Sequence, residues 1–168
     1  MVNIYAEFLS LVQIKIPENK KTKCIIFSKK SKDLKVPRNV ILDGNPLPWV
    51  ADVKHLGNTL ENDNSMRLDC SIKRGIFIGK VNSILQEFHN IDPSLLLKLI
   101  NTFATSLYGS QLWLLLSKEC ERLFTAWNVT VRNVFNLNRK THRNLIEELS
   151  QTIHLKTAVL SRYLTFDI

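Results

Sequence analysis

Apolar positions in the first sixty residues come in short runs of strand length, broken by Pro and Gly. Asp43-Gly44 suits a two-residue hairpin turn, and Pro46 and Pro48 allow only an edge strand after that turn. Gly57 lies inside a run and indicates a bulge or a close backbone approach. The expected strands cover residues 23–28, 40–42 and 53–60.

The pattern changes near residue 62, because apolar residues then recur every three or four positions, as on one face of a helix. Asn64 or Ser65 can cap the first of these helices, and Pro93 suits the first turn of the next. With a short helical stretch near the start, the expected helices cover residues 5–13, 65–88, 93–112, 117–135, 141–149 and 155–164. We therefore expect an α+β fold, in which a small antiparallel β-sheet (residues 1–62) precedes a mainly α-helical bundle (residues 63–168).

The helix that follows Ser117 has the cleanest amphipathic pattern of the chain. Its apolar stripe consists of Leu123, Phe124, Trp127, Val131, Val134 and Phe135. The aromatic residues of the stripe fall at core spacing, so we expect them to pack in the core rather than stack on bases.

The positive charge of the chain is concentrated in one segment. The 168 residues have a net charge of +8, and residues 15–38 contain nine Lys or Arg against Glu18 and Asp33, a net charge of +7. A concentrated positive field favours polyanions, because each phosphate that is neutralised releases condensed counterions. From charge alone, a solvated loop is an equally good interpretation.

Cysteine usage and hydropathy bear on the compartment. Cys24, Cys70 and Cys120 are an odd number, lie far apart and include no Cys-x-x-Cys, which indicates reduced thiols in the cytoplasm or nucleus. The most apolar stretch, residues 95–116, is interrupted by Lys98 and by several polar residues. It favours a buried helix over a membrane span, so we expect no membrane partner.

Local motifs of catalysis and metal binding are absent from the sequence. There is no phosphate-binding Gly-x-x-x-x-Gly-Lys-Ser/Thr loop, no Gly-x-Ser-x-Gly and no His-Glu-x-x-His. The histidines stand alone, at positions His55, His89, His142 and His154, which favours structural roles. The acidic residues form no pattern that could hold two metal ions, so we expect no metal site and no small-molecule cofactor in this chain.

Five short motifs follow one another in a distinctive order. They are Asn19-Lys20-Lys21-Thr22-Lys23, Val53-Lys54-His55-Leu56-Gly57, Leu107-Tyr108-Gly109 with Trp113, Trp127 with Arg132, and Thr141-His142-Arg143. In this order, over residues 15–166, they resemble the region after the catalytic core of non-LTR (LINE-type) retrotransposon reverse transcriptases. These enzymes are RNA-directed DNA polymerases. The resemblance implies the end of the palm with its primer grip over residues 1–62, and the thumb with the following helical region over residues 63–168.

The resemblance also implies a role for each region. Lys21 corresponds to a lysine proposed to protonate the departing pyrophosphate or to stabilise its charge. Lys54 to Gly57 correspond to the primer grip, where a glycine lets backbone amides approach a phosphate. The helices would clamp the duplex of RNA template and DNA primer. The implied nucleic-acid-binding residues are Lys20, Lys23, Lys54, His55, Leu56, Gly57, Arg67, Lys73, Arg74 and Lys80. A solvated surface remains an alternative for each of the helical residues.

The sequence departs from this family at the catalytic centre. A complete enzyme holds two Mg²⁺ ions with carboxylates, two of them from a Tyr/Phe-x-Asp-Asp turn, and this chain has no such turn. We therefore expect the C-terminal part of a truncated or decayed enzyme, which binds nucleic acid and does not polymerise alone. The alternative is a non-enzymatic helical module that binds nucleic acid, or in which the Trp127 stripe meets a partner helix.

Overall fold

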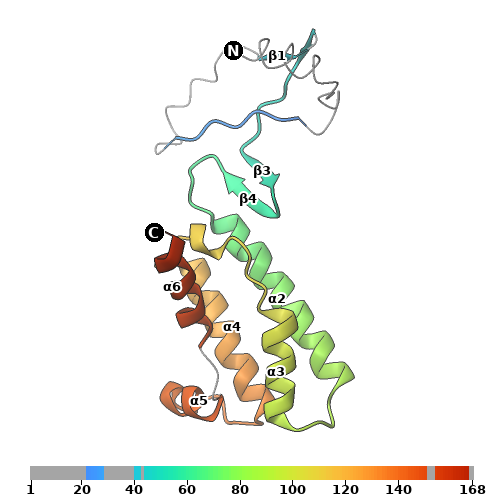
Figure 1. The fold of residues 1–168 in the computed structure, drawn as a ribbon, viewed down its shortest axis with the longest axis vertical. Coiled ribbons are helices and arrows are strands. Elements are labelled where there is room, and N and C mark those ends of the chain that lie inside the picture. The colour runs from blue at the N-terminus through green and yellow to red at the C-terminus, as the bar shows by residue number, and fades with distance from the viewer. Residues whose placement is uncertain (1–21, 29–39, 43, 151–153, 167–168) are drawn as a thin grey trace. The chain divides into compact units, whose positions relative to one another are not determined.

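A computed structural model describes residues 22–28, 40–42, 44–150 and 154–166. The chain divides into two compact units, one of residues 1–55 and 60–64, the other of residues 56–59 and 65–168. Two small two-stranded sheets precede a mainly helical region (Figure 1). This confirms the α+β fold that the hydrophobic pattern predicts. The helix expected over residues 5–13 and most of the basic segment lie outside the described residues.

The first sheet is the hairpin expected around Asp43-Gly44. It pairs β1 (Ile41–Leu42) with β2 (Asn45–Pro46) in antiparallel register, with Leu42 opposite Asn45. Gly44 has the positive φ, 80°, that such a turn requires. The predicted turn position is therefore confirmed.

The strand expected over residues 23–28 is not formed. Cys24 makes a single isolated bridge to Trp49. The bridge consists of hydrogen bonds of 2.9 Å from the Cys24 N–H to the Pro48 carbonyl and from the Val50 N–H to the Cys24 carbonyl. Pro48 has no N–H to donate, so the pairing does not extend from Cys24 toward residue 22.

Residues 53–60 form a hairpin, and the prediction of one continuous strand over these residues is wrong. The hairpin joins β3 (Asp52–His55) to β4 (Asn58–Glu61). Its turn residues, Leu56 and Gly57, both have positive φ, at 47° and 80°, as a two-residue turn of this kind demands. Leucine rarely adopts positive φ, which is why the sequence did not predict a turn there.

The first helix of the second unit, α2 (Arg67–Glu87), begins without a side-chain cap. Its N-cap is Met66, with a left-handed φ of 54°, and the predicted caps Asn64 and Ser65 are wrong. The Met66 side chain is buried in the core. Apolar burial therefore fixes the start of the helix in place of a capping hydrogen bond.

The next helix, α3 (Pro93–Ala104), starts as predicted and ends early. The Asp92 carboxylate accepts hydrogen bonds from the Ser94 and Leu95 amides, and Pro93 occupies the first turn. The helix does not continue to residue 112. A separate 3₁₀ turn, η2 (Ser110–Leu112), follows Gly109, whose φ is 80°.

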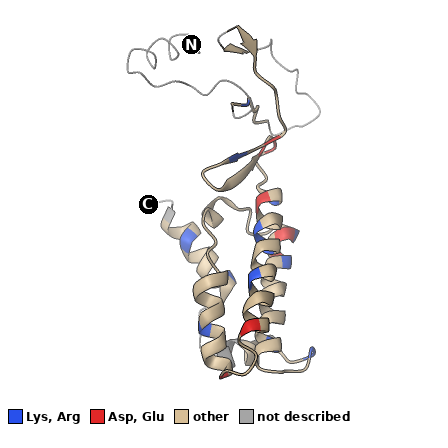
Figure 2. Cartoon of the chain, turned by 90° about the vertical axis from the view of Figure 1, so that its right-hand side faces the viewer, with Lys and Arg blue, Asp and Glu red and all other residues tan. Residues whose placement is uncertain are grey.

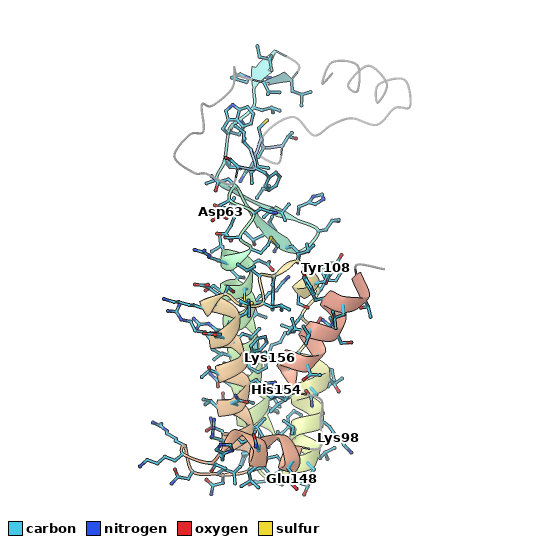
Figure 3. All side chains as sticks on the ribbon, turned by 90° about the vertical axis from the view of Figure 1, so that its left-hand side faces the viewer. Asp63, Lys98, Tyr108, Glu148, His154 and Lys156 are labelled. Carbon is cyan, nitrogen blue, oxygen red and sulfur yellow. The ribbon has the colours of Figure 1, made fainter. Side chains whose placement is uncertain are left out.

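The remaining helices occur where the pattern predicts them. They are α4 (Lys118–Val134), α5 (Arg143–Ser150) and α6 (Leu155–Phe166). Ser117 caps α4 by accepting the Cys120 N–H at 3.3 Å. His154, labelled at the start of α6 in Figure 3, accepts the Lys156 N–H through Nδ1 at 3.0 Å and lies 2.9 Å from Asn128 Oδ1 through Nε2. His154 thus has the structural role expected of a lone histidine.

The core of the second unit is formed where α2, α3 and α4 run side by side (Figure 1). Trp127 is 1% exposed and its ring centroid lies 6.3 Å from that of Phe77 on α2. The other buried members of the predicted stripe are Leu123, Phe124, Val131 and Val134. The core prediction is confirmed for these residues, and this stripe is not exposed to a partner helix.

Within the described part of the chain, no helix is long and apolar enough to cross a membrane. The apolar stretch of residues 95–116 is divided among α3, a loop and η2.

Candidate nucleic-acid interface

The buried carboxylate of Asp69 joins three parts of the second unit. Asp69 lies in the first turn of α2 and is 1% exposed. Its Oδ1 accepts the Thr59 N–H at 2.8 Å, and its Oδ2 accepts the Trp113 indole N–H at 2.8 Å. Lys73 Nζ lies 2.9 Å from the same Oδ2. Asp69 therefore fixes the start of β4 and the segment after η2 against α2.

Lys73, one of the predicted nucleic-acid-binding residues, is bound within the chain. Its side chain is 12% exposed. Besides Asp69, its ammonium donates to Asn58 Oδ1 at 2.5 Å and to the Tyr108 carbonyl, and it lies 5.7 Å from the Trp113 ring centroid. An ammonium has three N–H donors, and all three have acceptors here. Lys73 is therefore placed to hold the site together.

One motif glycine, Gly109, lies at a close approach within this cluster, and a second, Gly57, lies next to it. A Cβ on Gly109 would lie 2.0 Å from Asn58 Oδ1, and the φ of Gly109 is 80°. A Cβ on Gly57 would lie 3.9 Å from the Tyr108 ring. Three motif segments that are far apart in sequence thus lie near Asp69 and Lys73. They are Leu56-Gly57, Leu107-Tyr108-Gly109 and Trp113.

The last two motifs also meet. Arg132, near the end of α4, donates through Nη2 to the Thr141 carbonyl at 2.9 Å. Arg162 on α6 donates through Nη1 to the Leu107 carbonyl at 2.8 Å. Both arginines bond carbonyls of irregular segments, so these cations stabilise connections between elements.

The primer-grip-like residues lie on the β3–β4 hairpin. All four are exposed: Lys54, His55, Leu56 and Gly57. The side chain of Leu56, at the turn, is 73% exposed. Lys23 is exposed too, whereas Lys20 and Lys21 lie outside the described residues.

The four predicted cations of α2 do not share one groove. Lys80 donates to the Phe103 carbonyl of α3 at 3.0 Å, and Lys73 faces the Tyr108 carbonyl on the same flank. Arg67 and Arg74, seven residues apart, share another side of the helix, and Arg74 lies beside α4. Figure 2 shows Lys and Arg spread over the helices of this unit.

A groove between α2 and α4 is lined by two arginines, one from each helix. It has a volume of about 380 Å³ and is lined by Arg74, Ile78, Val81, Asn82, Arg122, Thr125, Ala126, Val129, Thr130 and Asn133. None of these residues is acidic. Among the described residues, neither Arg74 nor Arg122 makes an ion pair. The Thr125 and Thr130 hydroxyls donate to carbonyls of their own helix. The lining thus offers guanidinium and amide donors to an anion.

The two helices run parallel, since Cys70 contacts Cys120 and Phe77 contacts Trp127. Arg74 and Arg122 therefore lie in the N-terminal halves of α2 and α4. Arg122 was not predicted. Arg122 follows Lys118 by four residues, so the two side chains share one face of the helix. The sequence alone does not show that this face adjoins α2.

The described residues do not fit the Mg²⁺ ions of a complete polymerase. Among them, no three His, Cys, Asp or Glu side chains lie close enough to hold a metal ion. The oxygens of Asp69, the buried carboxylate, already accept from Thr59, Trp113 and Lys73. We derive no catalytic step through magnesium.

No known protein family matches this sequence, and no curated protein or solved structure matches it either.

We expect Asp69→Asn to lower the free energy of unfolding by about 2–4 kcal/mol, because it leaves Lys73 without its ion pair and places an amide where donors converge. Urea denaturation checks this value. The matched control is Asp92→Asn at the exposed N-cap of α3, where asparagine caps as well as aspartate. Equal losses in the two variants would contradict the role given to Asp69.

Gly109→Ala is expected to destabilise the protein by about 2 kcal/mol or more, through its positive φ and its overlap with Asn58. The cost should shrink in an Asn58→Ala background, which removes the overlapping atoms. Gly75→Ala is the control, since a Cβ there meets no atom within 4 Å and alanine favours the helix by about 0.5–1 kcal/mol. Thermal denaturation of the four variants measures these differences.

Proposed function

We propose that this chain is a nucleic-acid-binding part of a non-LTR retrotransposon reverse transcriptase, which holds the duplex of template and primer and lacks the catalytic carboxylates. The single observation that carries the binding role is the groove between α2 and α4, with Arg74 and Arg122 on its two sides and no acidic lining residue.

The chemistry of the groove suits a phosphate backbone. Guanidinium groups bind phosphates through paired hydrogen bonds, and the Asn82 and Asn133 amides add neutral donors. Contacts of this kind position a duplex without reading its sequence. A polymerase needs such contacts because its substrate changes in sequence at every step.

The convergence of the motifs supports the relationship to reverse transcriptases. The hairpin turn at Leu56-Gly57 is held near Tyr108 and Trp113 by the Asp69–Lys73 cluster. In the proposed enzyme, this cluster orients the primer-grip turn relative to the thumb helix, while the exposed Lys54 and His55 remain available to the primer backbone.

The test measures the binding of a labelled RNA–DNA primer–template by fluorescence anisotropy at several salt concentrations. The wild-type protein should bind, and log Kd should rise linearly with log salt concentration. In Arg74→Gln/Arg122→Gln, affinity should fall about tenfold and the salt slope should decrease by about 1.8, because each lost phosphate contact releases about 0.9 fewer counterions.

The control is Lys98→Gln/Lys156→Gln, which removes the same charge from two exposed residues on α3 and α6 (Figure 3). Neither lysine lines the groove. The affinity of this double variant for the duplex should therefore stay close to that of the wild type. Equal losses in both double variants would mean that net charge alone attracts the duplex. No binding by the wild-type protein at low salt would reject the proposed function.

A further inference from the structure

Two cysteines meet inside the second unit at the N-terminal ends of α2 and α4. Cys70 Sγ lies 3.5 Å from Cys120 Sγ, although fifty residues separate them in sequence. Both side chains are buried, at 1% and 0% exposed. A disulfide is about 2.05 Å long, so the two sulfurs need to approach by about 1.5 Å to bond.

The surroundings make the two thiols unequal. The hydrogen bond from Cys70, together with one from Ser117, lowers the pKa of Cys120 to about 7 against the opposing effect of burial. The same thiol–thiol hydrogen bond, then burial and the negative charges of Asp69 and Glu119, raise the pKa of Cys70. Each cysteine lies in the first turn of its helix, where the helix dipole favours a thiolate for both. The difference between the two thiols therefore comes from their hydrogen bonds and the neighbouring charges. Cys120 is therefore the nucleophile of the pair.

We propose that Cys70 and Cys120 form a reversible disulfide when the protein meets hydrogen peroxide, and that this bond links the first turns of α2 and α4. Sequence spacing alone indicates no such pair, because the cysteines belong to no common motif.

The chemistry has two steps. The Cys120 thiolate attacks one peroxide oxygen, so that an S–O bond forms, the O–O bond breaks, and the departing hydroxide takes up the proton that Cys120 released. Cys70 then attacks the resulting sulfenic sulfur, the S–S bond forms and the S–O bond breaks, and the second hydroxide leaves as water with the Cys70 proton. In sum, two thiols are oxidised and one peroxide is reduced to two waters.

Hydrogen peroxide is small, so it can reach the buried thiols through brief local openings of the fold. A thiol reductant reverses the bond by exchange at either sulfur. The linkage closes a long loop that contains α3 and η2, which restricts the unfolded chain and stabilises the fold.

To test this, the wild-type protein is treated with hydrogen peroxide and its remaining thiols are blocked. Its peptides are then mapped by mass spectrometry without reduction. The expected product is one cross-linked pair of peptides, containing Cys70 and Cys120, in monomeric protein. Cys24→Ser should give the same product. Melting of the oxidised protein should occur about 10 °C above that of the reduced protein, and dithiothreitol should restore the original value.

Two further variants distinguish the reactivity of each thiol from an effect of the substitution on core packing. In Cys70→Ser, which keeps the shape of the side chain, peroxide should leave a sulfenic acid on Cys120 that dimedone traps. In Cys120→Ser, dimedone should not label Cys70. The proposal is overturned if wild-type Cys70 and Cys120 remain reduced while Cys24 is oxidised, or if the cross-link joins two copies of the chain.

Discussion

The second unit depends on one buried carboxylate. Asp69 accepts hydrogen bonds from the backbone of Thr59 and the indole of Trp113 and pairs with Lys73. A charge out of water is tolerated only with full hydrogen bonding, so each partner is held in a narrow range of positions. That requirement brings the hairpin turn, the start of α2 and the segment after η2 together.

Six of the described cations fall into two groups by their surroundings. Lys73, Lys80, Arg132 and Arg162 donate to oxygens within the protein. Arg74 and Arg122 line a groove without acids. Charge in the first group stabilises the fold, because it satisfies carbonyls of helix ends and loops. The second group remains able to bind an external anion, and it carries the proposed contact with a nucleic-acid backbone.

Sequence reasoning failed where backbone conformation was unusual for the residue. Leu56 and Met66 both adopt positive φ, the first at a hairpin turn and the second at a helix start, and neither residue type signals this. It also failed where one helical pattern crossed a break, since the apolar positions continue past Ala104 although α3 ends there. Of the two arginines in the groove, the sequence predicted Arg74 as a nucleic-acid-binding residue. Arg122 could be recognised only from the packing of α4 against α2.

The sequence by itself determined that helices follow residue 65 and that the apolar stripe of α4 is buried, because hydrophobic periodicity and the caps at Asp92 and Ser117 are local properties. It also determined the order of the motifs. Only the tertiary structure decided which lysine forms an ion pair, that Cys70 meets Cys120, and that Gly109 meets Asn58 beside that ion pair. These are contacts between residues distant in the chain, set by how helices pack, and no local pattern encodes the distance between them.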